Sequence, residues 1–292
     1  MIKRWILRFL VTVSLVLVLT ALIAGMPGGL SGPVYAPRFS FVAYLTSLTG
    51  MLSDIATGSL GITRYGENAF VRAITYYGRS LTLLWKALVI ALACGVAVGL
   101  LGRGRLRGLR LGATVALSSP DFLIVMFLQL ALISLAHAGV RVPGWTAGGG
   151  VKSLLPALVL SLFPMAYVAQ IVSAAAERVM AEDYIRTAVA KGLHPMQILR
   201  RHALRNVLVE ALPSLSGLWG ILTSNLIIVE YFFLWPGAGQ RMVNCMADPR
   251  AADPRLATTL ALLFAVTYLV LDAATVLAWR LLDPRVKGDA RL

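Results

Sequence analysis

Few side chains of this sequence could carry out covalent chemistry, and their placement argues against a catalytic site. Ser216 could act as a nucleophile with His194 or His202 as its base, because serine catalysis needs a base within hydrogen-bond reach. Both histidines, however, fall in a polar stretch, whereas Ser216 falls in an apolar one. The sequence also lacks an H-E-x-x-H pair that could hold zinc in a metalloprotease. The residues therefore support an intramembrane hydrolase less well than a protein without catalytic activity. We expect neither a catalytic residue nor a metal site.

Two glycine-rich segments do not fit a nucleotide site. Residues 148–153 lack the G-x-x-x-x-G-K-S/T spacing of a phosphate-binding loop. Residues 102–110 follow no predicted strand, so they do not fit a dinucleotide-binding turn. Their arginines instead suit a short cytosolic turn between membrane spans. We therefore expect no cofactor in this chain.

The longest polar and charged run, residues 181–206, lies between two apolar stretches. Gly192 interrupts this run. Pro195 follows where a second helix can begin, because proline fits the first helical turn. A helix–glycine–helix element held by membrane helices on both sides suits docking against another protein, so contact is its predicted role.

Composition indicates an integral membrane protein. Of the 292 residues, 58% are hydrophobic and 14% are charged, compared with about 45–50% and about 25% in soluble domains. The apolar residues form long runs. The net charge of +14 does not indicate nucleic-acid binding, because the basic residues flank the apolar runs and form no polar domain of their own. The two cysteines, Cys94 and Cys245, are too few for a disulfide framework.

The apolar runs predict an all-α fold with six membrane spans. The spans fall near residues 5–25, 80–101, 111–136, 154–176, 207–229 and 256–281. The first run is too long for a signal peptide, and no small-x-small cleavage site follows it. We divide the chain into an N-terminal transmembrane helix (1–25), an extracytoplasmic segment (26–79) with an interfacial helix near 39–52, and a five-helix core (80–292).

The basic residues predict the orientation of these spans. Most of the 27 lysines and arginines lie in the segments that face the cytosol if both termini are inside, as the positive-inside rule requires. This orientation places the polar loop 177–206 in the cytosol. We therefore expect a multi-pass membrane protein in contact with the lipid bilayer.

Polar and small residues within the spans are candidates for a translocation path. Asp121 follows Pro120, and a carboxylate in hydrocarbon costs about 2.5–3.5 kcal/mol on insertion scales, so it should face protein or the path. Gly217, Gly220 and Ser224 recur at helical spacing on one face. That face suits either close helix packing or the wall of a path.

Three motifs resemble the permeases of ABC importers, and the dipeptide/oligopeptide/nickel permease family is the most similar. D-Y-I-R-T-A at 183–188 with A-K-G at 190–192, and R-H-A-L-R-N at 201–206, are similar to that family's cytoplasmic coupling loop. Residues 229–239 are similar to its V-E-T-x-F-x-W-P-G-x-G run, with Tyr231 in place of threonine.

The resemblance implies a type I importer permease in a prokaryotic inner membrane. It would pair with a second homologous permease, two ABC ATPases and an extracytoplasmic solute-binding protein. ATP and magnesium would bind to the ATPases. The solute would be a di- or oligopeptide, and a nickel chelate or glutathione is the alternative. A passive channel would not need the docking stretch.

The resemblance also assigns roles to residues of the three motifs. Those implied to contact the ATPases are Asp183, Tyr184, Arg186, Thr187, Ala188, Ala190, Lys191, Gly192, His202, Arg205 and Asn206. Those implied to form an extracytoplasmic turn are Glu230, Trp235, Pro236, Gly237 and Gly239.

Overall fold

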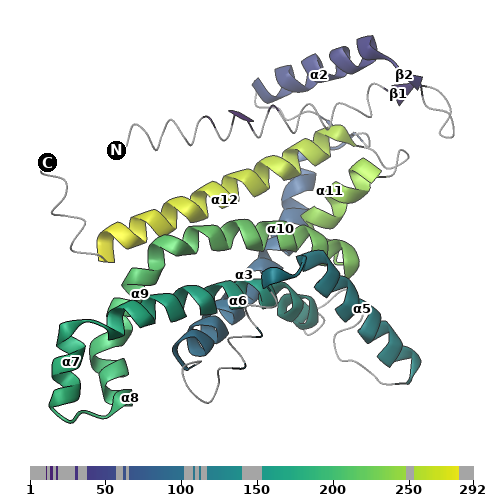
Figure 1. Ribbon diagram of the computed structural model, residues 1–292. Coiled ribbons are helices and arrows are strands. Elements are labelled where there is room, and N and C mark those ends of the chain that lie inside the picture. The colour runs from purple at the N-terminus through teal and green to yellow at the C-terminus, as the bar shows by residue number, and fades with distance from the viewer. Residues whose placement is uncertain are drawn as a thin grey trace, which may run out of the picture. The chain divides into compact units, whose positions relative to one another are not determined.

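The computed structural model describes residues 38–56, 62–63, 66–101, 117–139, 153–247 and 253–282, with a few isolated residues outside these ranges (Figure 1). The described elements are helical apart from two short antiparallel strands, β1 (Leu30–Ser31) and β2 (Arg38–Phe39). The all-α prediction is confirmed. The helices are, in chain order, α2 (Phe41–Ala56), α3 (Ala69–Leu101), α5 (Asp121–His137), α6 (Leu154–Met180), α7 (Asp183–Ala190), α8 (Pro195–Ile198), the π-helix η3 (Leu199–Ala203), α9 (Leu204–Ala211), the 3-10 helix η4 (Leu212–Leu215), α10 (Ser216–Phe232), α11 (Ala238–Ala247) and α12 (Pro254–Leu282).

Among the described residues, four helices are long and apolar enough to cross a membrane: Ala69–Leu101, Leu154–Met180, Pro195–Phe232 and Arg255–Leu282. They correspond to the second, fourth, fifth and sixth predicted spans. The third differs, because the helix is interrupted at Ser119 and Pro120 and the apolar helix after the break is shorter. Proline disfavours helical geometry in the residue before it. Nearly all of the first predicted span lies outside the described residues, so the structure supports a multi-pass protein without describing six spans.

The second predicted span starts earlier than expected, at Ala69 instead of Ser80. Asn68 explains this start, because its side-chain oxygen accepts hydrogen bonds from the backbone N–H groups of Phe70 and Val71 at 2.9 and 3.4 Å. Asparagine is a preferred N-cap residue. The boundary proposed between residues 79 and 80 therefore falls inside a continuous helix.

The chain divides into two compact units, and the first contains Met1–Leu83, Thr146–Gly149 and Leu226–Leu269. Within it, the first part of α3 contacts α12 through Tyr77, whose ring packs edge-on against Phe264 with centroids 5.7 Å apart. The Tyr77 hydroxyl also hydrogen-bonds to the Thr267 hydroxyl. These contacts fix one aromatic side chain of α3 against one face of α12.

The second unit contains Leu84–Trp145, Gly150–Asn225 and Val270–Leu292. Its helices α3 and α6 approach closely at two glycines. A Cβ atom at Gly95 would lie 2.7 Å from Val168 Cβ, and one at Gly99 would lie 2.8 Å from Val172 Cβ. Neither site has room for a side chain. The two glycines have the G-x-x-x-G spacing that lets membrane helices approach each other closely.

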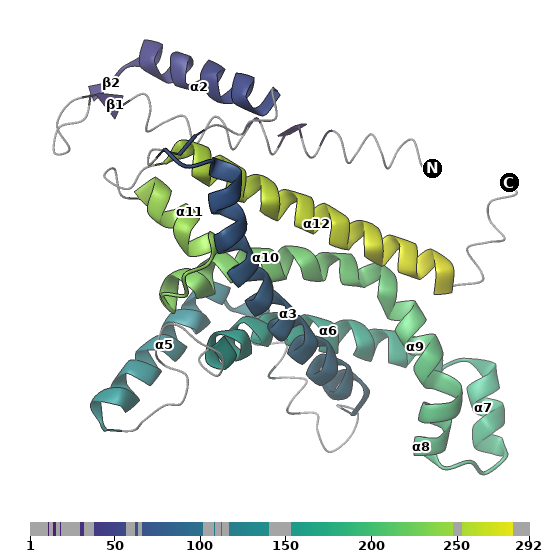
Figure 2. The same ribbon diagram turned by 180° about the vertical axis from the view of Figure 1, so that it is seen from behind.

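The fifth predicted span is not a uniform helix. The 3-10 helix η4, which contains Pro213, separates α9 from α10, because proline cannot donate the backbone hydrogen bond of an α-helix. The Tyr167 hydroxyl of α6 donates a hydrogen bond of 2.9 Å to the Ser214 carbonyl, which holds this break against α6. Beyond the ends of α6 and α9, helices α7 and α8 lie side by side (Figures 1 and 2).

Candidate functional site

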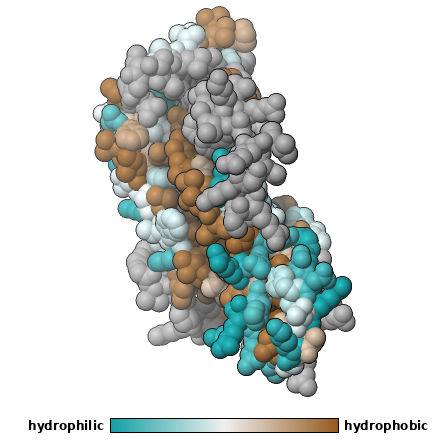
Figure 3. Space-filling view, turned by 90° about the vertical axis from the view of Figure 1, so that its left-hand side faces the viewer, coloured by the Kyte–Doolittle hydropathy of each residue, from teal (hydrophilic) through white to brown (hydrophobic). Residues whose placement is uncertain are grey.

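Helix α7 is a short amphipathic helix at the end of α6. Ile185 and Ala188, three positions apart and therefore on one helical face, are buried at 2% and 6% exposure. Tyr184 and Val189 are exposed. In Figure 3, hydrophilic side chains gather over α7 and α8 at the lower end of the view. The helix therefore has one face packed against its own chain and another open to a partner.

Gly192 ends α7 in a defined turn. The Leu193 N–H donates to the Ala188 carbonyl at 3.4 Å, and the Gly192 N–H donates to the Val189 carbonyl at 2.9 Å. These are the two hydrogen bonds of a Schellman motif. Gly192 has a φ of +76°, and nothing lies within 4 Å of an added Cβ. The glycine is therefore required by its backbone conformation and not by lack of space.

His194 caps helix α8, which begins at Pro195 as predicted. Its ring Nδ1 accepts a hydrogen bond from the Met196 N–H at 3.3 Å, and the backbone N–H of His194 donates to Gln197 Oε1 at 3.4 Å. This reciprocal arrangement is a capping box. The Ser216 hydroxyl donates to the Pro213 carbonyl of the preceding helix η4 at 3.2 Å. Two residues of the hydrolase alternative, His194 and Ser216, therefore have structural roles.

Helices α8, η3 and α9 return the chain to α6. Ile198, Ala203 and Val207 are buried along this path. Asn206 Nδ2 donates a hydrogen bond of 2.8 Å to the Tyr184 hydroxyl, which joins a residue of the first motif to one of the second. We call residues 183–206 the coupling hairpin.

The structure places most of the predicted ATPase-contacting residues on the surface of this hairpin. The exposed ones are Asp183, Tyr184, Arg186, Thr187, Ala190, Lys191, Gly192, His202, Arg205 and Asn206. Ala188 is buried and packs within its own chain here, so a partner contact for this residue stays a prediction. Asp183 and Arg186 form an ion pair of 3.3 Å within α7.

Sequence reasoning missed an ion pair below the hairpin. Arg178 Nε of α6 lies 2.7 Å from Glu210 Oε1 of α9. The two residues are 32 positions apart, so no local spacing pattern could reveal the pair.

The candidate path residues occupy different structural settings. Asp121 begins α5, where its carboxylate accepts a hydrogen bond from the Phe122 N–H. A Cβ atom at Gly217 would lie 2.3 Å from the Tyr167 hydroxyl oxygen, so this glycine serves helix packing. The Ser224 hydroxyl donates to the Gly220 carbonyl of its own helix at 2.9 Å. The contact at Gly217 suits close helix packing, whereas Ser224 is exposed, so a role of this face in a path stays a prediction.

The predicted extracytoplasmic turn is built around a buried carboxylate. Glu230 is fully buried, and its Oε2 accepts hydrogen bonds from the backbone N–H groups of Gly239 and Gln240 at 2.7 and 3.3 Å. The Ser80 hydroxyl accepts from the Ala238 N–H at 2.7 Å. Because the first N–H groups of a helix have no partner within it, these side chains cap the start of α11.

The other residues of this motif are also structural. A Cβ atom at Gly237 would lie 2.2 Å from Glu230 Oε1. Trp235, Gly237 and Gly239 are buried, whereas Pro236 is partly exposed. The motif therefore forms and caps the turn into α11, and most of its side chains are not at the surface.

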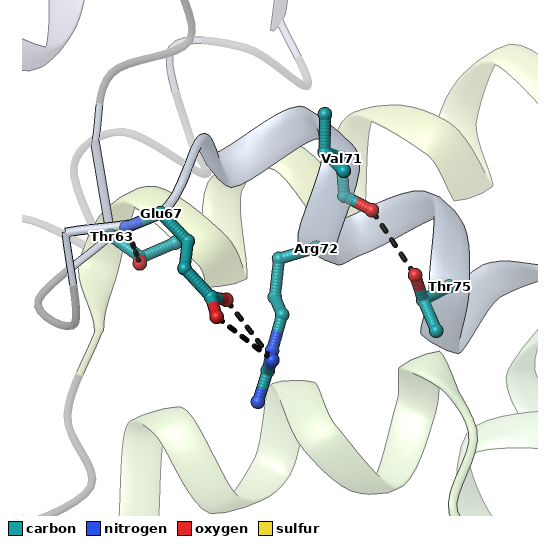
Figure 4. Close-up of polar contacts among 5 residues, drawn as sticks. All are labelled: Thr63, Glu67, Val71, Arg72 and Thr75. Carbon is teal, nitrogen blue, oxygen red and sulfur yellow. Dashed lines mark hydrogen bonds and ion pairs between the residues drawn. The ribbon is translucent and has the colours of Figure 1, made fainter.

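Charged and aromatic residues cluster near the start of α3 in the same unit. Arg72 and Glu67 form an ion pair of 3.0 Å, shown in Figure 4. The guanidinium groups of Arg72 and Arg241 lie 5.6 and 5.8 Å from the ring centre of Tyr76, within cation–π range. No sequence motif marked this cluster.

The Cys245 thiol of α11 is a separate buried group, and burial raises its pKa.

Residues 87–288 match the family model described as "Binding-protein-dependent transport system inner membrane component". The chain belongs to this family. This permease is 31% identical over 211 residues to the dipeptide transport system permease protein DppB of Bacillus subtilis (strain 168), covering 71% of the chain and 67% of that protein. It is 28% identical over 254 residues to the DppB of Haemophilus influenzae, covering 86% and 71%. The match confirms the family that the three motifs predict, the permeases of ABC importers.

Two further matches, one to a sequence and one to a solved structure, are named for other solutes. The permease is 26% identical over 273 residues to the glutathione transport system permease protein GsiC of Shigella flexneri serotype 5b, covering 89% of the chain and 81% of that protein. A chain from inward-facing structures of the MetNI methionine ABC transporter matches with a TM-score of 0.48 at 18% identity, covering 73% of the permease and 96% of that chain.

Proposed function

We propose that this permease forms the translocation path of an ATP-driven importer for di- or oligopeptides. It would pair with a second homologous permease and receive solute from an extracytoplasmic binding protein. Two ATPase subunits would dock on the coupling hairpin at the cytosolic face, with both termini of the chain on the same side. ATP and magnesium would bind to the ATPases.

The observation that carries this proposal is the coupling hairpin, with its exposed docking face and its internally fixed backbone. Tyr184, Val189 and Met196 are exposed apolar side chains on α7 and α8. A cavity of about 440 Å³ lined by Met196, Gln197, Arg200 and Arg201 lies on α8 and η3. Exposed apolar side chains next to positive charges are typical of a surface that is buried in a groove of a partner protein, because contact with water is unfavourable for them.

The same hairpin supports a mechanism for coupling. The Schellman turn at Gly192 and the capping box at His194 hold α7 and α8 in one geometry. Closure of the two ATPases would therefore displace the hairpin as a body and move α9 and α10 with it. The transport cycle would be a two-state equilibrium, and the ATPases would shift it through contacts that differ between inward-open and outward-open states.

The peptide assignment is supported by the dipeptide permeases among the relatives. The glutathione permease of Shigella flexneri supports a second candidate, a glutathione-like solute with the same importer architecture. The ligand carried by the cognate binding protein would separate the two, because that protein presents the solute to the permease.

The first experiment is purification of the tagged permease from its native host in mild detergent, with mass spectrometry of the proteins that accompany it. We expect a second permease and ATPase subunits. Val189→Asp should lose the ATPases, because a carboxylate replaces an exposed apolar contact, whereas Val189→Ala should retain them. Recovery of the wild-type permease without any ATPase would overturn the proposal.

A further inference from the structure

Two polar side-chain pairs connect the two arms that meet at the coupling hairpin, the arm that enters it from α6 and the arm that leaves it through α9. Just outside the hairpin, Arg178 of α6 and Glu210 of α9 are joined at 2.7 Å. Further along, the Asn206 amide donates to the Tyr184 hydroxyl at 2.8 Å. Each pair joins the segment that enters the hairpin to the segment that leaves it, so the two pairs connect the arms at two levels.

The ion pair is poorly suited to a role in stability. The side chains of Arg178 and Glu210 are 60% and 38% exposed, and exposed ion pairs contribute little to the free energy of unfolding. Buried apolar residues between the arms, among them Val179, Ile185 and Val207, already hold the hairpin together. A contact that adds little stability can still determine how two helices move relative to each other.

The arm that leaves the hairpin contains a helical turn, η3, at which movement between α8 and α9 could be lost. In η3, the Leu204 N–H donates to the Leu199 carbonyl, five residues earlier, which is the wider turn of a π-helix. Such turns are common where helices bend and at functional sites. A displacement of α7 that travelled only through α8 and η3 could be absorbed by bending at this turn. The ion pair lies beyond η3 and joins α9 directly to the end of α6.

We propose that Arg178 and Glu210 are positioning residues that make α6, the coupling hairpin and α9 move as one body. This inference rests on the proposed function, because it assigns the pair to the transfer of ATPase movement. Loss of the ion pair would leave the hairpin folded and docked. Closure of the ATPases would then bend the chain at η3 instead of moving α9 and α10.

The test uses the complex purified from the native host with its ATPases. The binding protein is purified from the same host with the ligand that it carries, and its stimulation of ATP hydrolysis is measured on reconstituted complex. The variants are Glu210→Gln, Arg178→Gln and the charge-swapped double variant R178E/E210R. Glutamine keeps the size of the glutamate side chain and removes its charge.

We expect each single variant to retain its ATPases and its basal hydrolysis rate. The melting temperature should change by less than about 3 °C, because the pair is exposed. Stimulation by the binding protein should fall about fivefold, within the roughly 2- to 30-fold range of mutations in coupled networks. The charge-swapped variant should recover most of the stimulation, because it restores the attraction in the opposite sense.

Two results would overturn the inference while leaving the proposed function intact. One is normal stimulation in both single variants. The other is loss of stimulation that the charge swap does not restore, which would indicate local damage and not a missing ion pair. Failure of the wild-type complex to contain ATPases or to respond to the binding protein would instead refute the proposed function, and the inference with it.

Discussion

Gly237→Ala is the substitution whose effect follows most directly from the structure. The new Cβ would lie 2.2 Å from Oε1, 2.4 Å from Cδ and 2.5 Å from Oε2 of Glu230. All three distances are far below ordinary van der Waals contact, so either the carboxylate or the turn must move by about 1 Å. Glu230 is fully buried and cannot swing into solvent. The alanine should therefore displace the cap of α11.

The cost can be estimated from the contacts that this displacement breaks. Glu230 Oε2 accepts from the Gly239 N–H at 2.7 Å and from the Gln240 N–H at 3.3 Å. A buried acceptor left without a partner costs about 1–3 kcal/mol, and loss of a helix N-cap costs about 0.5–2 kcal/mol. Both figures describe the loss of the same hydrogen bonds, so they are not added, and we expect a loss of roughly 2 kcal/mol in the free energy of unfolding. This corresponds to a melting temperature lower by roughly 4–8 °C.

Thermal unfolding of the detergent-purified permease measures this effect, and Gly78→Ala is the matched control. Gly78 lies in α3 with nothing within 4 Å of an added Cβ, so alanine there should be neutral or slightly stabilising. The double variant E230D/G237A should be more stable than the sum of its single variants predicts, because the shorter side chain makes room for the Cβ. If Gly237→Ala melted with the wild type, Glu230 would not occupy the turn in solution.

Two other predictions concern the coupling hairpin and α11. Gly192→Ala should destabilise the permease by about 1–2 kcal/mol because residue 192 has a positive φ. Gly192→Asn should destabilise it by less, because asparagine tolerates this conformation. Thermal unfolding measures both variants, and a lower melting temperature for the larger asparagine would show that side-chain size determines the effect and not backbone conformation. With Cys94→Ser, Cys245 should react with maleimide slowly at neutral pH and faster at higher pH, since burial raises its pKa and the thiolate reacts. Rapid labelling at neutral pH without denaturant would contradict its burial.

Local signals account for the parts of the fold that the sequence predicted well. Long apolar runs predict spans because hydrocarbon leaves no partner for backbone groups except the helix itself. Gly192 and Pro195 predicted the turn and the new helix because their backbone preferences are intrinsic. Asn68 and the Gly95–Gly99 spacing carry comparable local information about the start of α3 and its packing against α6, although the span was predicted to start only at Ser80.

Side-chain partners were not predictable in the same way. The Arg178–Glu210 and Tyr184–Asn206 pairs join residues 32 and 22 positions apart. The sequence also places Glu230 at the end of an apolar span, where a carboxylate suggests an exposed position. Its burial depends on the way residues 235–240 fold back over it.

The sequence by itself determined the membrane class, the position of most spans, the permease family and the helix–glycine–helix form of the hairpin. These properties depend on composition, local backbone preference and motifs that are contiguous in the chain. Only the tertiary structure decided that Ala188 faces inward, that Gly217 makes room for Tyr167 and that Glu230 caps α11. Those roles arise when helices pack, because packing determines which side chains meet and which lose contact with their surroundings.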